Sequence, residues 1–211
     1  ALPPVGYEKA PQVRTFYGSL PERLETTPGV EHAGLVSVLP FGGSDTDTGF
    51  LIEGQPAPQA PGDRPTAWYR MVNPGYLRAL GMQMESGRFI EPIDVDGAQR
   101  VVVINQTLAR RHWPRENPIG RRIALGGGDA YTIVGVVRDV HHRTLREEPL
   151  GQMFLSYQQF SQRRMTIVLR TAGDPAGVIP ALRQHLASLH PHLPVSSVGT
   201  MGNLVTGLPA L

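Results

Sequence analysis

The clearest hydrophobic pattern lies in the middle of the chain. Val101–Ile104 is a continuous run of β-branched residues, which is typical of a strand buried on both faces. Asn105 suits the start of a helix, and Thr107–Trp113 predicts that helix. Ile123–Leu125 and Tyr131–Val137, joined by a Gly-rich turn, predict a hairpin. The predicted order is therefore strand, helix, strand, strand.

The N-terminal third predicts one helix and two strands. Apolar residues recur at helical spacing over 12–26, where Pro21 is expected to kink or restart the helix. A strand is predicted at 30–39. The stretch 40–65 is polar and rich in Gly and Pro, with a short strand at Phe50–Ile52. We expect the rest of it to be a loop and the most mobile internal segment.

Before the central block, 68–72 predicts a strand and 73–80 a short helix that ends at Gly81. Residues 82–96 are expected to be a link. Within this link, the pair Asp94 and Asp96 is interpreted as solvated loop residues, because a Ca²⁺ loop would need more oxygen ligands.

After the central block, two more strands are predicted, at 152–157 and Met165–Arg170. Asp174-Pro175 combines a capping carboxylate with a first-turn proline, so it predicts the start of a helix. A last strand is expected at 194–198, and residues 199–211 are expected to trail off without regular structure.

The two ends of the chain share an order of elements. Helix then strand at 12–39 parallels helix then strand at 175–198. This predicts an α+β fold whose first unit combines 1–75 with 152–211 as a βαβ arrangement. Residues 76–151 would form a second, inserted mixed α/β unit. Its predicted core consists of Leu80, Phe89, Val101, Val103, Leu108, Trp113, Ile123, Ile133 and Val136.

Composition narrows the function classes. The chain has 211 residues, of which 40% are hydrophobic and 18% are charged, so it is globular rather than disordered. Its net charge of +2 does not indicate a nucleic-acid partner. The absence of cysteine excludes a disulfide scaffold, a thiolate nucleophile and a Cys-ligated metal. No apolar run approaches the ~20 residues of a membrane span.

The side chains best suited to metal binding lie at Asp139, His141 and His142, with Glu147 and Glu148 nearby. Adjacent residues of a strand point to opposite faces, so His141 and His142 would diverge rather than share one ion. A solvated strand end is the favoured interpretation. We therefore predict no catalytic, metal or cofactor site, and keep a metal-dependent hydrolase using Asp139, His141 and His142 as an alternative.

A local basic cluster is the remaining candidate site. It comprises Arg110, Arg111, Arg115, Arg121 and Arg122. An exposed helix face and hairpin would explain these residues without any function. The other interpretation is an electrostatic docking surface for a partner protein.

The sequence also resembles a known family. The resemblance rests on VVVINQTLARRHWP (101–114), NPIGRRI (117–123) and YTIVGVVRDVHH (131–142), and on Val72–Leu77, Ser86–Phe89, Pro28–Val30 and 170–175 around them. Each motif alone is weak, but their ordered set covers nearly the whole chain. It is similar to the periplasmic core domain of MacB/FtsX-like ABC transporter permeases.

The resemblance implies a porter-like subdomain built from 1–75 and 152–211 and an inserted sabre-like subdomain at 76–151. It implies a periplasmic domain of a bacterial inner-membrane protein, membrane-anchored in the full-length chain, with both chain ends close together on one face. Its role would be mechanotransmission, efflux or export rather than catalysis. The implied partners are a cytoplasmic ATPase subunit or domain, a periplasmic adaptor protein, and a second copy in a homodimer of the full-length permease. A free-standing periplasmic binding module that uses the 40–65 loop stays as an alternative.

Overall fold

The computed structural model describes residues 2, 7–42, 46–56, 58–126, 128–140, 150–189 and 198–206. Helices and strands are mixed along this part of the chain, and its strands join into one sheet. The predicted α+β fold is therefore confirmed.

The helices fall into two long and three short ones, besides a 3₁₀ turn at Pro61–Asp63. They are α1 (Ala10–Glu25), α2 (Tyr76–Leu80), α3 (Gln106–His112), α4 (Pro175–Leu189) and α5 (Met201–Thr206). The strands are short and follow the predicted positions closely, with one addition. They are β1 (Val30–Val36), β2 (Asp47–Ile52), β3 (Thr66–Val72), β4 (Met84–Gly87), β5 (Val101–Asn105), β6 (Arg122–Leu125), β7 (Ala130–Val137), β8 (Gln152–Ser156) and β9 (Thr166–Thr171).

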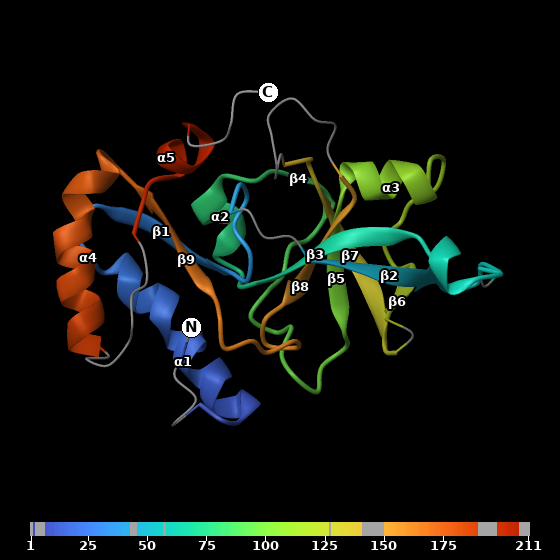
Figure 1. The fold of residues 1–211 in the computed structure, drawn as a ribbon, viewed down its shortest axis with the longest axis horizontal. Coiled ribbons are helices and arrows are strands. Elements are labelled where there is room, and N and C mark those ends of the chain that lie inside the picture. The colour runs from blue at the N-terminus through green and yellow to red at the C-terminus, as the bar shows by residue number, and fades with distance from the viewer. Residues whose placement is uncertain are drawn as a thin grey trace.

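The sheet runs in the order β2-β6-β7-β5-β8-β3-β1-β9, and β4 adds to β7. Two of its pairings are parallel, β5 with β7 and β3 with β8, and the others are antiparallel. Figure 1 shows β1 and β9 with α1 and α4 on one side of the molecule, and β2, β6, β7 and α3 on the other.

Six of these strands close on themselves, because β2 pairs twice. Its second half, Phe50–Ile52, pairs with β6, and its first half, Asp47–Gly49, pairs with β3. The circuit β2-β6-β7-β5-β8-β3 is therefore complete, like a small barrel. A closed circuit of this kind shortens the unpaired edges of a sheet.

Alternating side chains of the circuit fill its interior. Phe50, Val102, Ile133 and Leu155 come from different strands and share one buried cluster. Leu108 and Trp113, from α3 and the residue after it, join this cluster. The helix therefore belongs to the barrel core and is not only an attachment to it.

β1 and β9 extend the sheet beyond β3 and form an arm with a helix layer on each face. On one face, α1 and α4 pack against Leu35, Met71 and their neighbours. On the other face, α2 packs against Val36 and Val72. Gly34 lets α2 approach closely, since a Cβ there would lie 2.6 Å from the Tyr76 Cα atom.

β5 has the buried-strand character that its sequence predicts: all five of its residues are buried. Its side chains divide between two clusters, however. Val102 and Ile104 face the barrel interior, whereas Val101 and Val103 face an outer layer with Phe89. The core predicted for 76–151 is thus split, and each half is shared with residues outside that range.

Several local expectations need correction. α1 runs as one helix through Pro21, which is buried together with Leu20 and Leu24, so the helix does not restart there. In the stretch 40–65, β2 begins three residues before the predicted strand at Phe50–Ile52, and these additional residues pair with β3 to complete the barrel. The link 82–96 contains β4, and the end expected to trail off contains α5.

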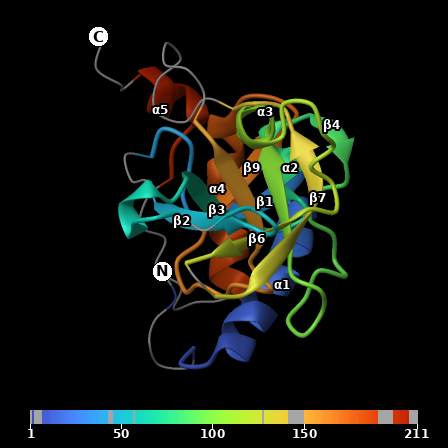
Figure 2. The same cartoon turned by 90° about the vertical axis from the view of Figure 1, so that its right-hand side faces the viewer.

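Two expectations fall at least partly outside the described residues. The predicted strand at 194–198 lies there except for Val198, and so do the extreme chain ends whose proximity we expect. The helices nearest to the two ends, α1 and α5, lie at opposite edges in Figures 1 and 2. Closeness of the chain ends stays a prediction.

The division into 1–75 with 152–211 and 76–151 also stays a prediction. The structure adds that strands of both parts pair directly, β5 with β8 and β2 with β6. Two lines of backbone hydrogen bonds therefore join them, in addition to the two chain crossings.

Candidate functional site

The predicted arginines lie at and around α3. Arg110 and Arg111 are in its last turn, Arg115 follows it, and Arg121 and Arg122 lead into β6. All five are exposed. The five arginines therefore lie on α3 and on the segment that follows it, up to the first residue of β6.

Three of the five arginines are paired with carboxylates. The distances between nitrogen and oxygen are 2.9 Å for Arg110–Asp139, 2.7 Å for Arg121–Glu116 and 3.0 Å for Arg122–Glu53. Arg111 and Arg115 have no ion-pair partner among the described residues. The net positive charge of this cluster is therefore much smaller than the sequence suggests, and it is concentrated at Arg111 and Arg115.

Asp139, the candidate metal or catalytic carboxylate, anchors α3. Its Oδ1 accepts from Asn105 Nδ2 (2.7 Å) and the Thr107 backbone N–H (2.9 Å). Its Oδ2 accepts from the Thr107 hydroxyl (3.0 Å) and Arg110 (2.9 Å). A carboxylate with both oxygens engaged at a helix start satisfies backbone donors and holds the helix in place.

Asn105 completes this arrangement and is fully buried. Its Oδ1 accepts from the backbone N–H groups of Leu108 (3.1 Å) and Gln152 (2.9 Å). Its Nδ2 donates to Asp139 and to the Leu150 carbonyl (2.8 Å). All four hydrogen-bonding positions of the amide are used, so the predicted helix cap also ties β5 to β8 and to the end of β7.

His112 is the one titratable group of this end with a resolved pKa shift. Its ring stands edge-on to Phe50 and Trp113, with centroid distances of 5.3 and 5.9 Å. Burial lowers the pKa of His112, and the positive charge of Arg111 lowers it further. The imidazole is therefore neutral at neutral pH and fills space at the mouth of the barrel.

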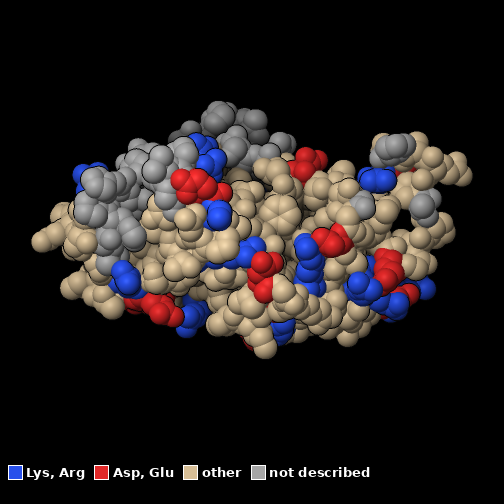
Figure 3. All heavy atoms as spheres, turned by 90° about the horizontal axis from the view of Figure 1, so that it is seen from below, with Lys and Arg blue, Asp and Glu red and all other residues tan. Residues whose placement is uncertain are grey.

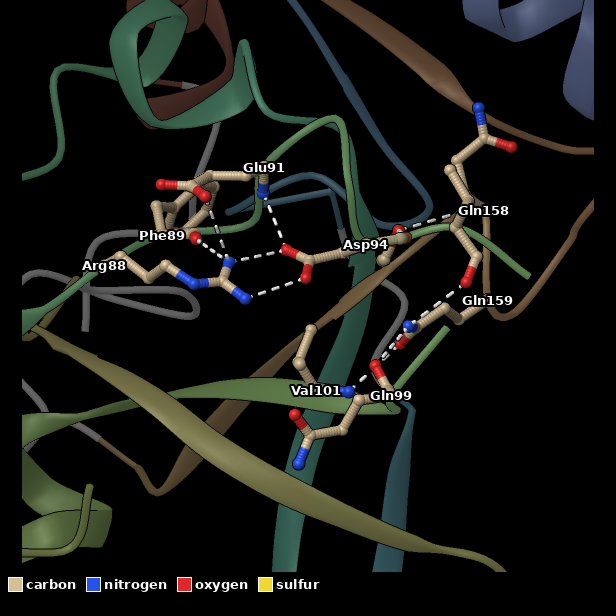
Figure 4. Close-up of polar contacts among 10 residues, drawn as sticks. Arg88, Phe89, Glu91, Asp94, Gln99, Val101, Gln158 and Gln159 are labelled. Atoms are coloured by element: carbon tan, nitrogen blue, oxygen red, sulfur yellow. Dashed lines mark hydrogen bonds and ion pairs between the residues drawn. The ribbon is translucent and has the colours of Figure 1, made fainter. Parts of the chain in front are cut away.

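A second polar cluster, which the sequence did not reveal, lies in the link between β4 and β5. Arg88 donates two hydrogen bonds to the Asp94 carboxylate, at 2.7 and 2.8 Å (Figure 4). The Asp94 side chain is only 4% exposed, whereas that of Arg88 is 35% exposed. The interpretation of Asp94 as a solvated loop residue is wrong, because Arg88 and the Glu91 backbone N–H (2.8 Å) satisfy its charge inside the fold.

A metal centre finds no support in the described part of the chain, where no three acidic or histidine side chains converge. His141, His142, Glu147 and Glu148 lie outside it. Figure 3 shows Lys/Arg and Asp/Glu side chains interspersed over the lower face, with wide uncharged areas between them. That face has no broad field of one sign of the kind that nucleic-acid binding requires.

Three solved structures have similar folds. The periplasmic region of MacB from Actinobacillus actinomycetemcomitans is 16% identical with a TM-score of 0.57, over 81% of this chain and 72% of that one. The extracellular domain of the noncanonic ABC-type transporter YknZ from Gram-positive bacteria is 14% identical with a TM-score of 0.55, over 81% of both chains. A domain of a putative permease protein from Porphyromonas gingivalis is 17% identical with a TM-score of 0.52, over 84% of this chain and 71% of that one.

These identities are low, so the three structures show a shared fold and no more. No protein among the curated sequences matches the chain. Within the described residues, no helix is long and apolar enough to cross a bilayer. The decisive match is a protein family, described as MacB-like periplasmic core domain, whose profile matches residues 10–185.

That match spans most of the chain and includes the barrel, α3 and both helix layers. Members of this family are domains of ABC transporter permeases, which work with an ATPase and are not known as enzymes. The chain therefore belongs to the MacB-like periplasmic core domain family and is a periplasmic domain of an ABC transporter permease.

Proposed function

We propose that this domain transmits ATP-driven movement of the transmembrane part of its permease to a partner protein in the periplasm. The domain itself is not an enzyme in this proposal, because the carboxylate of Asp139 holds α3 in place through four hydrogen bonds. A periplasmic adaptor protein is the first candidate for the partner, and the full-length permease would act as a homodimer.

The observation that carries this proposal is the continuous strand pairing between the terminal part of the chain and the α3 end. β3 and β8 pair in parallel over five residue pairs, and β8 pairs with β5, which leads into α3. Backbone hydrogen bonds are short and directional, so a displacement of one strand moves its neighbours with it. Movement entering at the α1 and α4 layer would reach α3 through this path.

The contact with the partner would be made at the end of the barrel around α3. Arg111 and Arg115 are exposed there and have no ion-pair partner among the described residues, so their charges are available to an acidic surface. Exposed charges of this kind guide association and orientation more than they contribute to folding.

The docking role is tested by the double substitution Arg111→Glu and Arg115→Glu in the full-length permease. Transport and ATP hydrolysis are measured together. Transport should fall while the thermal stability of the domain and the ATPase rate stay close to normal. Arg110 is left unchanged, because a carboxylate at that position would face Asp139 and disturb the start of α3.

A matched control is Arg78→Glu with Arg164→Glu, which makes the same change in charge at two exposed arginines outside the α1 and α4 layer and outside the β3-β8-β5 path. It should leave transport unchanged. Unchanged transport in the Arg111 and Arg115 variant, or an equal loss in the control, would remove the docking role from this cluster.

The rigidity of the join between 76–151 and the rest of the chain is tested by a disulfide between β2 and β6, which pair across it. Leu51 and Ala124 are directly opposite each other, and the chain has no cysteine of its own. Their separation in the ladder suits a Leu51→Cys and Ala124→Cys bridge. If the sheet moves as one rigid body, the disulfide restricts no movement that transport needs. Transport should then stay at its normal level after the two cysteines are oxidised. A loss of transport that a reductant reverses, and that Leu51→Cys alone does not show, would instead indicate a hinge between 76–151 and the rest.

A further inference from the structure

Three of the four exposed large hydrophobic side chains in the described part of the chain gather at one place. Ile93 is 69% exposed and Val95 is 40% exposed, and both lie in the link before β5. Phe160, which is 41% exposed, lies in the turn after β8. We call these three side chains the apolar knob. The fourth, Leu150, lies beside Asn105 at the other end of β5.

Hydrogen bonds hold the two segments of the knob against each other. The Ser156 hydroxyl donates to the Asp94 carbonyl at 2.7 Å, and Gln159 Nε2 donates to the carbonyls of Val95 (3.3 Å) and Gln99 (2.8 Å). The Gln159 side-chain oxygen accepts from the Val101 backbone N–H at 3.1 Å. Phe160 follows Gln159 in this turn, and its backbone N–H donates to the Ser156 carbonyl at 3.0 Å, so the turn that carries Phe160 is tied to the segment that carries Val95.

The ion pair between Arg88 and Asp94 determines which side chains face outward. Figure 4 shows the Asp94 carboxylate turned toward Arg88 and the Glu91 backbone N–H, inside the link. The two neighbours of Asp94 in the chain, Ile93 and Val95, are exposed. The fold thus uses a buried ion pair to present apolar side chains in a fixed arrangement, which reduces the entropy lost when a partner binds.

The close passage of the link over β7 supports this arrangement. A Cβ on Gly135 would lie 2.0 Å from the Arg88 carbonyl oxygen, so no larger residue fits there. The Arg88 backbone N–H also donates to the Val134 carbonyl at 2.9 Å. Arg88 is therefore fixed through its backbone as well as through its guanidinium group.

Two ion pairs border the knob, each with its carboxylate more exposed than its arginine. Asp96 is paired with Arg14, but the Asp96 side chain is 63% exposed and that of Arg14 only 19%. Glu91 is likewise more exposed than Arg88, its ion-pair partner at 3.7 Å. The carboxylates are thus at the surface and the cations beneath them. This sign is unsuited to an anionic lipid surface, which attracts Lys and Arg.

We infer that the apolar knob is a docking surface for a second protein, one with an apolar pocket bordered by Lys or Arg. The complementary charge of the carboxylates at Glu91 and Asp96 carries this choice of partner. The apolar knob includes the link that precedes β5 in the chain, whereas α3 follows β5. The knob is therefore separate from Arg111 and Arg115, the arginines of the proposed function. In Figures 1 and 2 the loop before β5 is at the lower end of the molecule and α3 is at the upper end.

The test places a photo-crosslinking amino acid at position 93 of the full-length permease in its own cell membrane. The protein joined to it is identified, purified and titrated against the permease. Wild-type permease should bind it, and Ile93→Asp with Phe160→Asp should lower the affinity about tenfold or more, because both remove contacts at the centre of the surface. Glu91→Gln with Asp96→Gln should weaken binding less and reduce its dependence on salt.

Leu150→Asp is the matched control, because it makes the same change in the remaining exposed large hydrophobic residue. It should leave the affinity unchanged, and circular dichroism on each variant checks the fold. Crosslinks only to lipid, only to a second copy of the permease, or to nothing would overturn the inference. If the Ile93 and Phe160 variant bound the partner with the same affinity as the wild type, the inference would also be overturned. This test measures affinity at the apolar knob, whereas the test of the proposed function measures transport in the Arg111 and Arg115 variant. The outcome of one test therefore does not determine the outcome of the other.

Discussion

The two ends of β5 are both fixed by a buried polar side chain, but in different ways. After β5, the neutral amide of Asn105 uses all four of its hydrogen-bonding positions. Before β5, the charged Asp94 is buried against the partly exposed Arg88. A neutral amide adds no net charge to the barrel core, whereas a buried carboxylate requires a cation.

This difference corresponds to the surroundings of each end of β5. The Asn105 end begins a helix whose residues Leu108 and Trp113 enter the barrel core, so a polar group there must be fully satisfied. The Asp94 end is close to solvent, and its ion pair orders a link whose apolar side chains face outward. The polar group at the Asn105 end therefore stabilises the barrel core, whereas the ion pair at the Asp94 end orders a link at the surface.

The largest effect is expected for Trp113→Ala, which removes the ring that fills the α3 end of the barrel. Trp113 is buried with Leu108 and Ile133 in one cluster. Loss of a buried aromatic ring should reduce the free energy of unfolding by about 3–5 kcal/mol. Urea unfolding of the domain measures it. A cost below about 1 kcal/mol would show that α3 is dispensable for the barrel core.

Asn105→Ala should come next, with a loss of about 2–4 kcal/mol in the free energy of unfolding. The substitution leaves the backbone N–H groups of Leu108 and Gln152 without their acceptor, and unsatisfied buried groups are costly. Urea unfolding again gives the value, and Gln106→Ala at the half-buried first residue of the same helix is the comparison. Near-equal stability of the two variants would contradict the role given to the amide.

Asp94→Ala should cost somewhat less, about 2–3 kcal/mol, because Arg88 is partly exposed and can regain water. Glu116→Ala removes a carboxylate from the exposed pair with Arg121 and should cost less than about 1 kcal/mol. Hydrogen exchange should also increase at the link before β5 in the Asp94 variant only. Similar hydrogen exchange in both variants would argue against the proposal that the ion pair between Arg88 and Asp94 orders that link.

The smallest effect concerns pH and His112. Burial lowers its pKa in the folded state, so the folded protein favours the neutral ring. Its contribution is present above the unfolded pKa of about 6.5 and is lost as pH falls below that value. The wild type should therefore lose more stability than His112→Gln between about pH 7.5 and about pH 5. Identical pH profiles in thermal unfolding would show that His112 does not contribute.

Much of the fold could be predicted from local pattern. The apolar run at Val101–Ile104 indicated a strand buried on both faces, and Asn105 indicated a helix cap, and the structure has both. The helix start at Asp174-Pro175 is also found, where the Asp174 carboxylate accepts from the Ala176 backbone N–H at 3.0 Å. These features depend on a few consecutive residues, which is why the sequence alone reveals them.

The candidate sites were less accessible to sequence reasoning. The five arginines are adjacent in sequence, but the carboxylates that pair with Arg110 and Arg122 are 29 and 69 residues away. Asp94 looked like an ordinary loop residue, although its distance of six residues from Arg88 leaves room for a turn that joins them. Its burial depends on the passage of the link over β7 at Gly135, which no local pattern encodes.

The sequence by itself determined the types of element, the α+β class and, through its ordered motifs, the family. The tertiary structure decided which strands are neighbours, above all that β2 pairs with both β3 and β6 and closes a barrel. It also decided that carboxylates neutralise most of the basic cluster and that Ile93, Val95 and Phe160 are exposed on segments joined by hydrogen bonds. Local propensity acts over a few residues, whereas pairing and burial depend on contacts between distant segments, and these exist only once the chain is folded.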